Sequence, residues 1–160
     1  MLDILLLILT IAIQGGGGGA TSTASVAVPQ TAPALVAEPQ VPTGQFTTAV
    51  EIKPILTMTQ SNWVAVRDFN GQDLVYFSHL LSWRCGLLRL RWGVNDGPLQ
   101  DWPLPPCYEG TNAPNAIKTE DGLPYVAQPA GSVQSVTIEI TYDDLEVQTA
   151  RFERAQILMP

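Results

Sequence analysis

From residue 50 onward, apolar and polar side chains alternate along the chain with a period of two, which is typical of half-buried β-strands. The clearest run is residues 136–142 (Val-Thr-Ile-Glu-Ile-Thr-Tyr), in which every second residue is apolar. Asp143 and Asp144 interrupt the pattern, and it resumes over residues 145–152. Because aspartate is common in turns, we predict two strands joined as a hairpin.

A second hairpin is predicted around Asn70-Gly71, since this pair favours the tight turns that join neighbouring strands. Its arms are residues 64–66 and 74–77, which are rich in valine, leucine and aromatic side chains. These residue types fit the pleated, half-buried surface of a strand.

Residues 88–92 (Leu-Arg-Leu-Arg-Trp) are the most regular of the remaining candidate strands. Its leucines, Leu88 and Leu90, and Trp92 should face the core, while Arg89 and Arg91 should face the solvent. The other candidates are residues 51–58, where Pro54 indicates an edge strand, and residues 63–67, 99–102 and 156–159.

Two segments do not follow the strand pattern. Residues 103–131 are rich in Pro, Asn and Gly, so we predict a long surface loop, and residues 79–83 favour a helical turn. Strands that recur about every 8 to 15 residues predict an all-β fold, a single antiparallel immunoglobulin-like β-sandwich over residues 49–160.

The chain before this domain has a different character. Ile4 to Ile13 is almost entirely apolar, the length of a signal-peptide core, whereas a membrane-spanning helix needs about twenty residues. We therefore predict that residues 1–27 are a signal peptide or an N-terminal membrane segment. No basic residue precedes Lys53, so the leader is unusual, begins upstream, or the segment is not a leader.

Residues 28–48 contain four prolines among Ala, Gln, Thr and Val, which predicts a flexible linker. It is either a spacer that holds the domain away from a membrane or a tail with no role. The expected location is the periplasm or the outside of the cell, and the alternative is membrane association through an uncleaved N-terminus.

Charge excludes one class of partner. The chain has 15 acidic and 8 basic residues, a formal net charge of −7, whereas phosphate backbones are bound by clusters of Lys and Arg. We expect no nucleic-acid partner.

Cys85 and Cys107 are the only cysteines, an even number in a domain that we expect to be exported. We predict a disulfide between them, because such pairs persist in oxidising compartments. Their spacing is not Cys-x-x-Cys, and the single histidine leaves a zinc site short of ligands. No metal or cofactor is expected.

Two groups of residues are candidates for catalysis or metal binding. Any histidine-based hydrolysis must use His79, with an acid such as Asp68, Asp73 or Asp101. The neighbouring Ser78 does not by itself make a triad, so a partly buried structural histidine is the simpler interpretation. Asp143, Asp144 and Glu146 are typical of a solvated turn rather than of a calcium or glycosidase site.

The densest basic cluster is Arg84, Arg89 and Arg91, flanked by Trp83 and Trp92. Trp83, Arg89, Arg91 and Trp92 could together form a ligand-binding surface for an anion or a carbohydrate. Alternatively, the arginines pair with acids on neighbouring strands, such as Glu139, and the tryptophans belong to the core.

Several short stretches are similar to small exported bacterial β-sandwich proteins of unknown function. They are residues 62–67 (Asn-Trp-Val-Ala-Val-Arg), 74–77, 83–87, 104–107 and 124–127. This resemblance implies an exported β domain without an assigned activity, and it transfers no functional residues.

The leading hypothesis is therefore an exported, non-catalytic interaction or structural module whose partner is another protein or an envelope component. The alternative is a shallow carbohydrate- or anion-binding module that uses the Trp and Arg residues. The third hypothesis is a hydrolase that uses the single histidine.

Overall fold

The computed structural model describes residues 32–160, and the account that follows concerns those residues. The predicted leader, residues 1–27, lies outside them. Within residues 32–160, no helix has both the length and the apolar character needed to cross a membrane.

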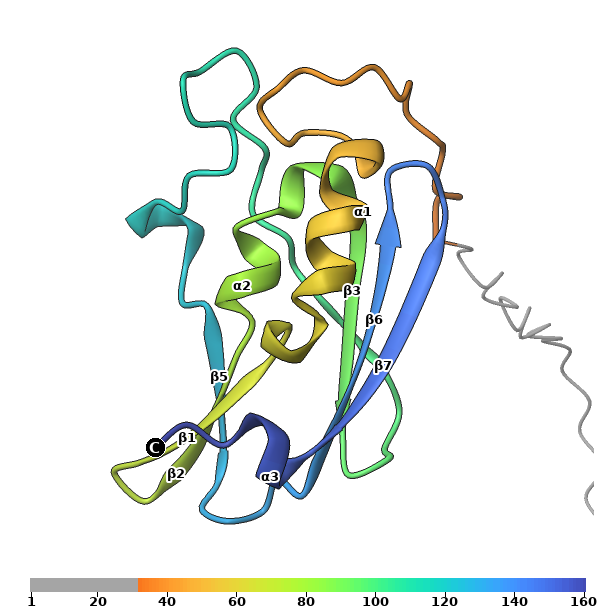
Figure 1. The fold of residues 1–160 in the computed structure, drawn as a ribbon. Coiled ribbons are helices and arrows are strands. Elements are labelled where there is room, and N and C mark those ends of the chain that lie inside the picture. The colour runs from red at the N-terminus through yellow and green to blue at the C-terminus, as the bar shows by residue number, and fades with distance from the viewer. Residues whose placement is uncertain (1–31) are drawn as a thin grey trace, which may run out of the picture. The chain divides into compact units, whose positions relative to one another are not determined.

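Two antiparallel sheets form most of the domain (Figure 1). The three-stranded sheet has the order β1-β2-β5, with β1 at Ala65–Phe69, β2 at Gln72–Tyr76 and β5 at Tyr125–Pro129. The four-stranded sheet has the order β4-β3-β6-β7, with β3 at Leu87–Val94, β4 at Gln100–Trp102, β6 at Ser135–Tyr142 and β7 at Val147–Glu153. The all-β class is confirmed, and the immunoglobulin-like sandwich stays a prediction.

Both predicted hairpins are confirmed. β1 and β2 pair on either side of Asn70 and Gly71, whose φ angles of 52° and 74° are those of the tight turn that this dipeptide favours. β6 and β7 pair from Ser135↔Glu153 to Thr141↔Val147. The strand predicted at residues 88–92 is β3, and the strand predicted at residues 99–102 is β4, which pairs with β3.

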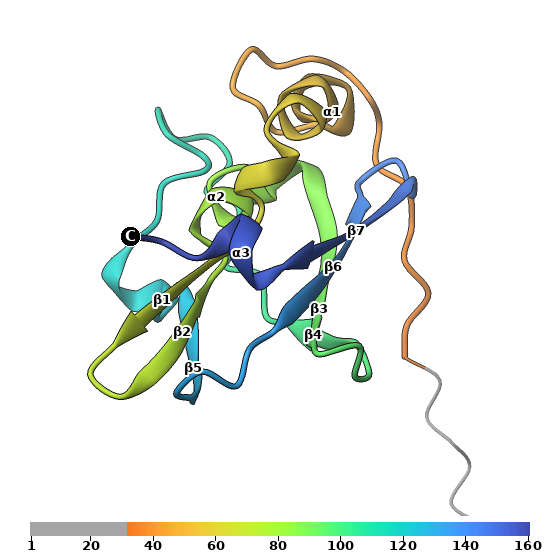
Figure 2. The same cartoon turned by 60° about the horizontal axis from the view of Figure 1, so that its bottom comes forward.

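Within residues 32–160, three α-helices accompany the sheets: α1 (Ala49–Met58), α2 (Ser78–Leu81) and α3 (Arg154–Ile157). Short 3-10 turns lie at Gln60–Asn62, Arg84–Gly86 and Thr119–Asp121. The ribbon views show α1 and α2 beside the strands (Figure 1 and Figure 2).

Helix α1 corrects the prediction of a strand over residues 51–58. Ala49, Ile52 and Leu56 are buried at helical spacing, and Ile52 and Leu56 fit a period of two equally well. The helix start is fixed by the Glu51 carboxylate, which accepts hydrogen bonds from the backbone N–H groups of Thr43, Gly44, Thr47 and Thr48.

Three further sequence predictions are corrected. The long loop predicted at residues 103–131 contains β5, which adds to the edge of β2. Residues 156–159 are not a strand: α3 ends at Ile157, and Leu158 makes only an isolated bridge to Val66. A bulge in β3 shifts the register, so Leu87 rather than Leu88 is buried.

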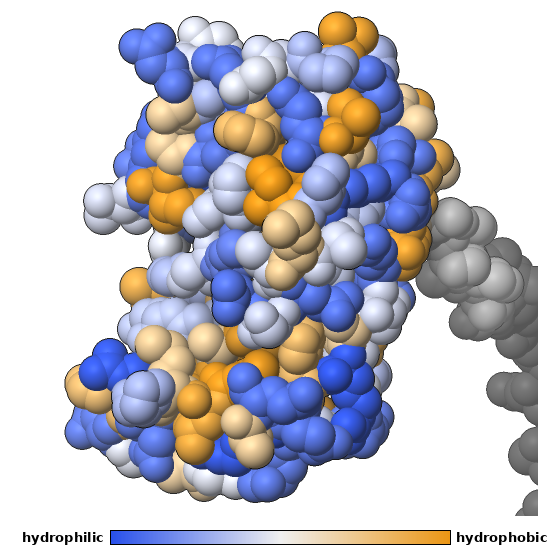
Figure 3. Space-filling view, viewed as in Figure 1, coloured by the Kyte–Doolittle hydropathy of each residue, from blue (hydrophilic) through white to orange (hydrophobic). Residues whose placement is uncertain are grey.

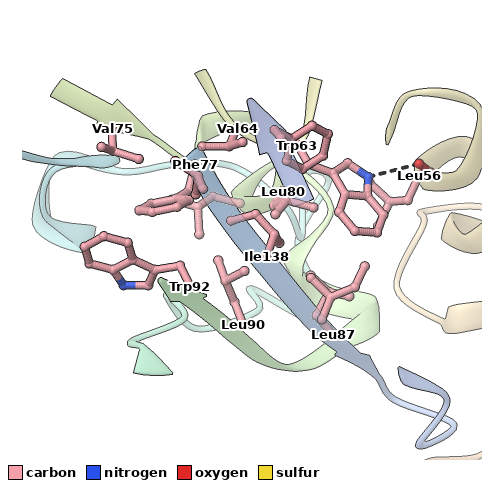
Figure 4. Packing of buried hydrophobic residues seen from close by; sticks show 14 of the residues in the cluster. Leu56, Trp63, Val64, Val75, Phe77, Leu80, Leu87, Leu90, Trp92 and Ile138 are labelled. Atoms are coloured by element: carbon pink, nitrogen blue, oxygen red, sulfur yellow. Dashed lines mark hydrogen bonds between the residues drawn. The ribbon is translucent and has the colours of Figure 1, made fainter. Parts of the chain in front are cut away.

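One core joins the sheets and the helices. It contains Leu56 of α1, Val75 of β2, Leu90 of β3 and Ile138 of β6, none of them accessible to solvent (Figure 4). Trp63 fills the space beside α1, and its indole N–H donates a 2.9 Å hydrogen bond to the Leu56 carbonyl (Figure 4). The buried indole is therefore both packed and hydrogen-bonded.

The segment before α1 contacts the β6–β7 turn. The Glu38 N–H donates to the Asp143 carbonyl at 2.7 Å, and the side chain of Asp143 accepts hydrogen bonds from the Ala49 N–H and from Gln40. Asp143, expected in a solvated turn, is only 1% exposed, because it joins this segment to the start of α1. Burial raises the pKa of its carboxyl.

Candidate functional site

The four residues proposed as a ligand-binding surface do not lie together. Trp92 is 4% exposed, and its ring packs against Phe77 at 5.4 Å between ring centroids. Arg89 and Arg91 alternate with it along β3 and therefore project from the other face of the sheet. Trp83 lies outside this sheet, in contact with Phe46. No single surface contains both the tryptophan faces and the arginines.

The two strand arginines are engaged in ion pairs. Arg89 forms a two-point pair with Asp101, and Arg91 pairs at 2.9 Å with Glu139, the residue directly opposite it on β6. The cross-strand pairing with Glu139 is the alternative that the sequence left open.

Arg84, counted with the surface cluster in the sequence, is buried. Its guanidinium and Nε donate hydrogen bonds to backbone carbonyls at distances of 2.7–3.2 Å. The acceptors are Leu81, Pro105, Pro106, Asn115 and Ala116. Arg84 thus holds the irregular segment after β4 against the domain.

The predicted disulfide is confirmed. Cys85 and Cys107 are bonded, with 5.0 Å between their Cα atoms and a sequence separation of 22 residues. Closing a loop of this length stabilises the folded state by about 3 kcal/mol in the chain-entropy model. The bridge fixes the same segment that Arg84 holds from the inside.

A pocket of about 340 Å³ opens on the outer face of the three-stranded sheet. Ala65 and Tyr76, which are opposite each other in the β1–β2 register, line it together with Arg67. Its other walls come from Asn62, from Ser78 and His79 at the start of α2, and from Met159. The lining is mainly apolar, and it includes residues that carry hydroxyl, amide and guanidinium groups, which is the usual composition of a ligand site.

Arg67 is the distinctive group of this pocket. All eight basic residues of the chain lie within the described range, and six of them form ion pairs there. The remaining two are Lys118, which lies 3.6 Å above the Tyr108 ring, and Arg67, which lies 4.6 Å from the Phe69 ring centroid. Since Arg67 faces Leu74 across the hairpin, its register partner offers no carboxylate. Among residues 32–160, its guanidinium lies against an aromatic ring and forms no ion pair.

His79 lines the pocket as a neutral side chain. Its Nε2 lies 2.8 Å from the Thr59 hydroxyl, and burial lowers the pKa of the imidazole below its usual value of 6.5. Of the acids proposed as catalytic partners, Asp73 binds Arg154 and Asp101 binds Arg89. His79 therefore does not form the predicted pair with Asp73 or with Asp101.

Most of the pocket was not anticipated from sequence. Asn62, Arg67 and Met159 come from separate segments, and only folding brings them together. One signal was present: the Asn-Gly turn fixes the hairpin register, which places Leu74 rather than an acid opposite Arg67.

Comparisons of the chain with protein-family models, with curated proteins and with solved structures give no match. Among residues 32–160, no three His, Cys, Asp or Glu side chains are grouped so that they could hold a metal ion.

Proposed function

We propose that this chain is an exported, non-catalytic recognition module that binds an acidic segment of a partner protein in the Arg67 pocket. The observation that carries the proposal is an arginine without an ion-pair partner among the described residues, at the wall of a pocket in a chain of net charge −7. In such a chain most cations are engaged by neighbouring acids, so an arginine that lines a cavity, stacks on Phe69 and has no ion-pair partner points to an external carboxylate.

The other walls favour a carboxylate that has an apolar neighbour. Ala65 and Met159 offer apolar contact, and the Asn62 amide can donate a hydrogen bond to the second carboxylate oxygen. Neutral His79 adds no second charge, so a singly charged group fits better than a phosphate. The volume of about 340 Å³ suits one or two side chains.

The face of the molecule drawn in Figure 3 supports a local contact rather than a broad apolar interface. On the face drawn in Figure 3, apolar side chains form small groups that are separated by polar ones. A large obligate interface would need a more continuous apolar area. Catalysis by His79 has less support, because its ring forms a hydrogen bond with the Thr59 hydroxyl rather than with a carboxylate.

Binding can be tested with blocked peptides in which Asp or Glu is flanked by Leu, Phe or Tyr. The readout is the change in the amide chemical shifts of the labelled protein when a peptide is added. Arg67→Gln is expected to weaken binding at least tenfold, about 1.4 kcal/mol, because it removes the charge-assisted pair. Lys118→Gln, which removes the same charge from the other cation outside an ion pair, should change affinity less than twofold. The proposal fails if no peptide, at a concentration of about 10 mM, shifts the amide signals of the pocket residues. It also fails if Arg67→Gln and Lys118→Gln bind the peptide with equal affinity.

Export is a separate part of the proposal and is supported by the disulfide, since such bonds are rare in reducing compartments. In protein isolated from its native host, Cys85 and Cys107 should react with iodoacetamide only after reduction, as read by intact mass. Alkylation of both thiols without reduction would place the domain in a reducing compartment.

A further inference from the structure

We propose that a second site, a groove lined by Phe46 and Trp83, binds an uncharged saccharide. The groove has a volume of about 390 Å³ and lies between the segment before α1 and the loop at residues 112–116. Figure 1 shows these two segments near each other, and a hydrogen bond from the Gln45 side chain to the Thr111 carbonyl joins them. This site is independent of the Arg67 pocket.

Two aromatic side chains contribute to the apolar part of the groove, beside Ala113, Pro114 and Ala116. Phe46 is 43% exposed, and its ring meets the partly exposed ring of Trp83 edge-on, with 5.4 Å between centroids and an interplanar angle of 83°. An exposed aromatic pair of this kind offers area for the C–H face of a sugar ring. Trp83 is one of the residues that the sequence predicts to bind a carbohydrate, and its aromatic neighbour here is Phe46.

The polar part of the groove is uncharged. Its side chains include Asn112 and also Asn115, Gln45 and Ser82, which already hydrogen-bond to backbone groups of the domain. None of the lining residues carries a formal charge. Amides both donate and accept hydrogen bonds, as sugar hydroxyls do. A charged ligand would lose hydration without finding a counter-charge in the groove, so the lining favours a neutral polyhydroxyl compound over an ion.

The groove is also held in place by unusual backbone geometry. Phe46 has a φ of 58°, a left-handed conformation that is unfavourable for a bulky residue by about 1–2 kcal/mol. The Asn115 side chain fixes this conformation, because its Nδ2 donates to the Phe46 carbonyl at 2.9 Å while its Oδ1 accepts from the Cys85 N–H. Strain of this kind persists where the surroundings enforce it, as in ligand clamps. A preformed groove loses little entropy when it binds a ligand.

The test uses the full chain with cellohexaose, maltohexaose and the N-acetylglucosamine hexamer as neutral probes, and trigalacturonate as a charged comparator. We expect at least one neutral probe to shift the indole N–H signal of Trp83, with a weaker effect of the charged comparator. Phe46→Gly removes the ring but tolerates the positive φ, so it should weaken binding at least tenfold without unfolding the groove.

Phe69→Gly is the matched control, because Phe69 is 51% exposed and lies in β1, away from the lining of the groove. Phe69→Gly should bind the sugar with the affinity of the wild type. Arg67→Gln should do so as well, and this result would separate the groove from the proposed peptide site. A Trp83 signal that no neutral probe moves would overturn the inference, as would equal affinities of the Phe46→Gly and Phe69→Gly variants.

Discussion

Replacing Arg84 by methionine is expected to lower the free energy of unfolding by about 4 kcal/mol. Methionine fills a similar volume but donates no hydrogen bond. The carbonyls that accept hydrogen bonds from Arg84 would therefore lose this donor. Two of them, Pro105 and Pro106, lie in the segment after β4, and two more, Asn115 and Ala116, lie further along the same segment. The nearest carboxylate, Asp121, is 3.9 Å away, so hydrogen bonds to carbonyls are the main contacts of the guanidinium.

Arg89→Met is the matched control for this variant. Arg89 also binds a partner through its guanidinium, Asp101, but both side chains are substantially exposed, at 42% and 60%. Exposed ion pairs contribute about 0–1 kcal/mol. Urea unfolding should therefore separate the two variants by about 3 kcal/mol, and amide exchange over residues 103–118 should accelerate in Arg84→Met alone. Equal stabilities would show that the buried network has no structural role.

The contrast between these two arginines also shows where sequence reasoning stops. Arg89 and Arg91 alternate with apolar residues, so their outward position on β3 follows from the period alone. Arg84 precedes the strand in a 3-10 turn, and four of the five residues whose carbonyls accept its hydrogen bonds lie in a proline-rich segment with no periodic signal. Nothing local in the sequence distinguishes a surface arginine from a buried one at that position.

A similar limit applies to α1 and to the pocket. Hairpins were predictable because their turn residues and alternation are local properties, as at Asn70-Gly71. Residues 51–58 are compatible with both periods, and burial against the core selects the helix. The pocket depends on long-range contacts, such as the hydrogen bond from the Met159 N–H to the Val66 carbonyl, which holds the C-terminal segment beside β1.

Replacing Asp73 by asparagine is expected to lower the free energy of unfolding by about 3 kcal/mol at pH 6. Asp73 is fully buried, and both of its carboxylate oxygens accept hydrogen bonds from Arg154, at 2.6 and 3.0 Å. It also accepts the Val133 N–H at 3.0 Å. Asparagine keeps one acceptor but directs an N–H group at a guanidinium that has lost its counter-charge. The pair joins β2 of one sheet to α3, which follows the last strand of the other.

The effect of this substitution should depend on pH. The hydrogen bonds from Arg154 are the largest cause that lowers the pKa of Asp73 from 3.8 to about 2. Because the folded-state pKa is the lower one, the contribution of the carboxylate is complete above about pH 4 and is lost as the pH falls through about 2. This displacement corresponds to about 2 kcal/mol. The difference between wild type and Asp73→Asn should therefore narrow from about 3 kcal/mol at pH 6 to about 1 kcal/mol near pH 2.

Asp101→Asn provides the comparison, because Asp101 is also bound at two points by an arginine but is exposed. Its substitution should cost less than about 1 kcal/mol at pH 6. Urea unfolding of the three proteins between pH 2 and pH 7 measures both effects. A deficit in Asp73→Asn that stays constant over this range would mean that the loss comes from hydrogen-bond geometry alone. If the stabilities of the wild type and of Asp73→Asn instead converge at low pH, the loss comes from the charge of the carboxylate. Protonation of Asp73 in the wild type removes the same charge that the substitution does.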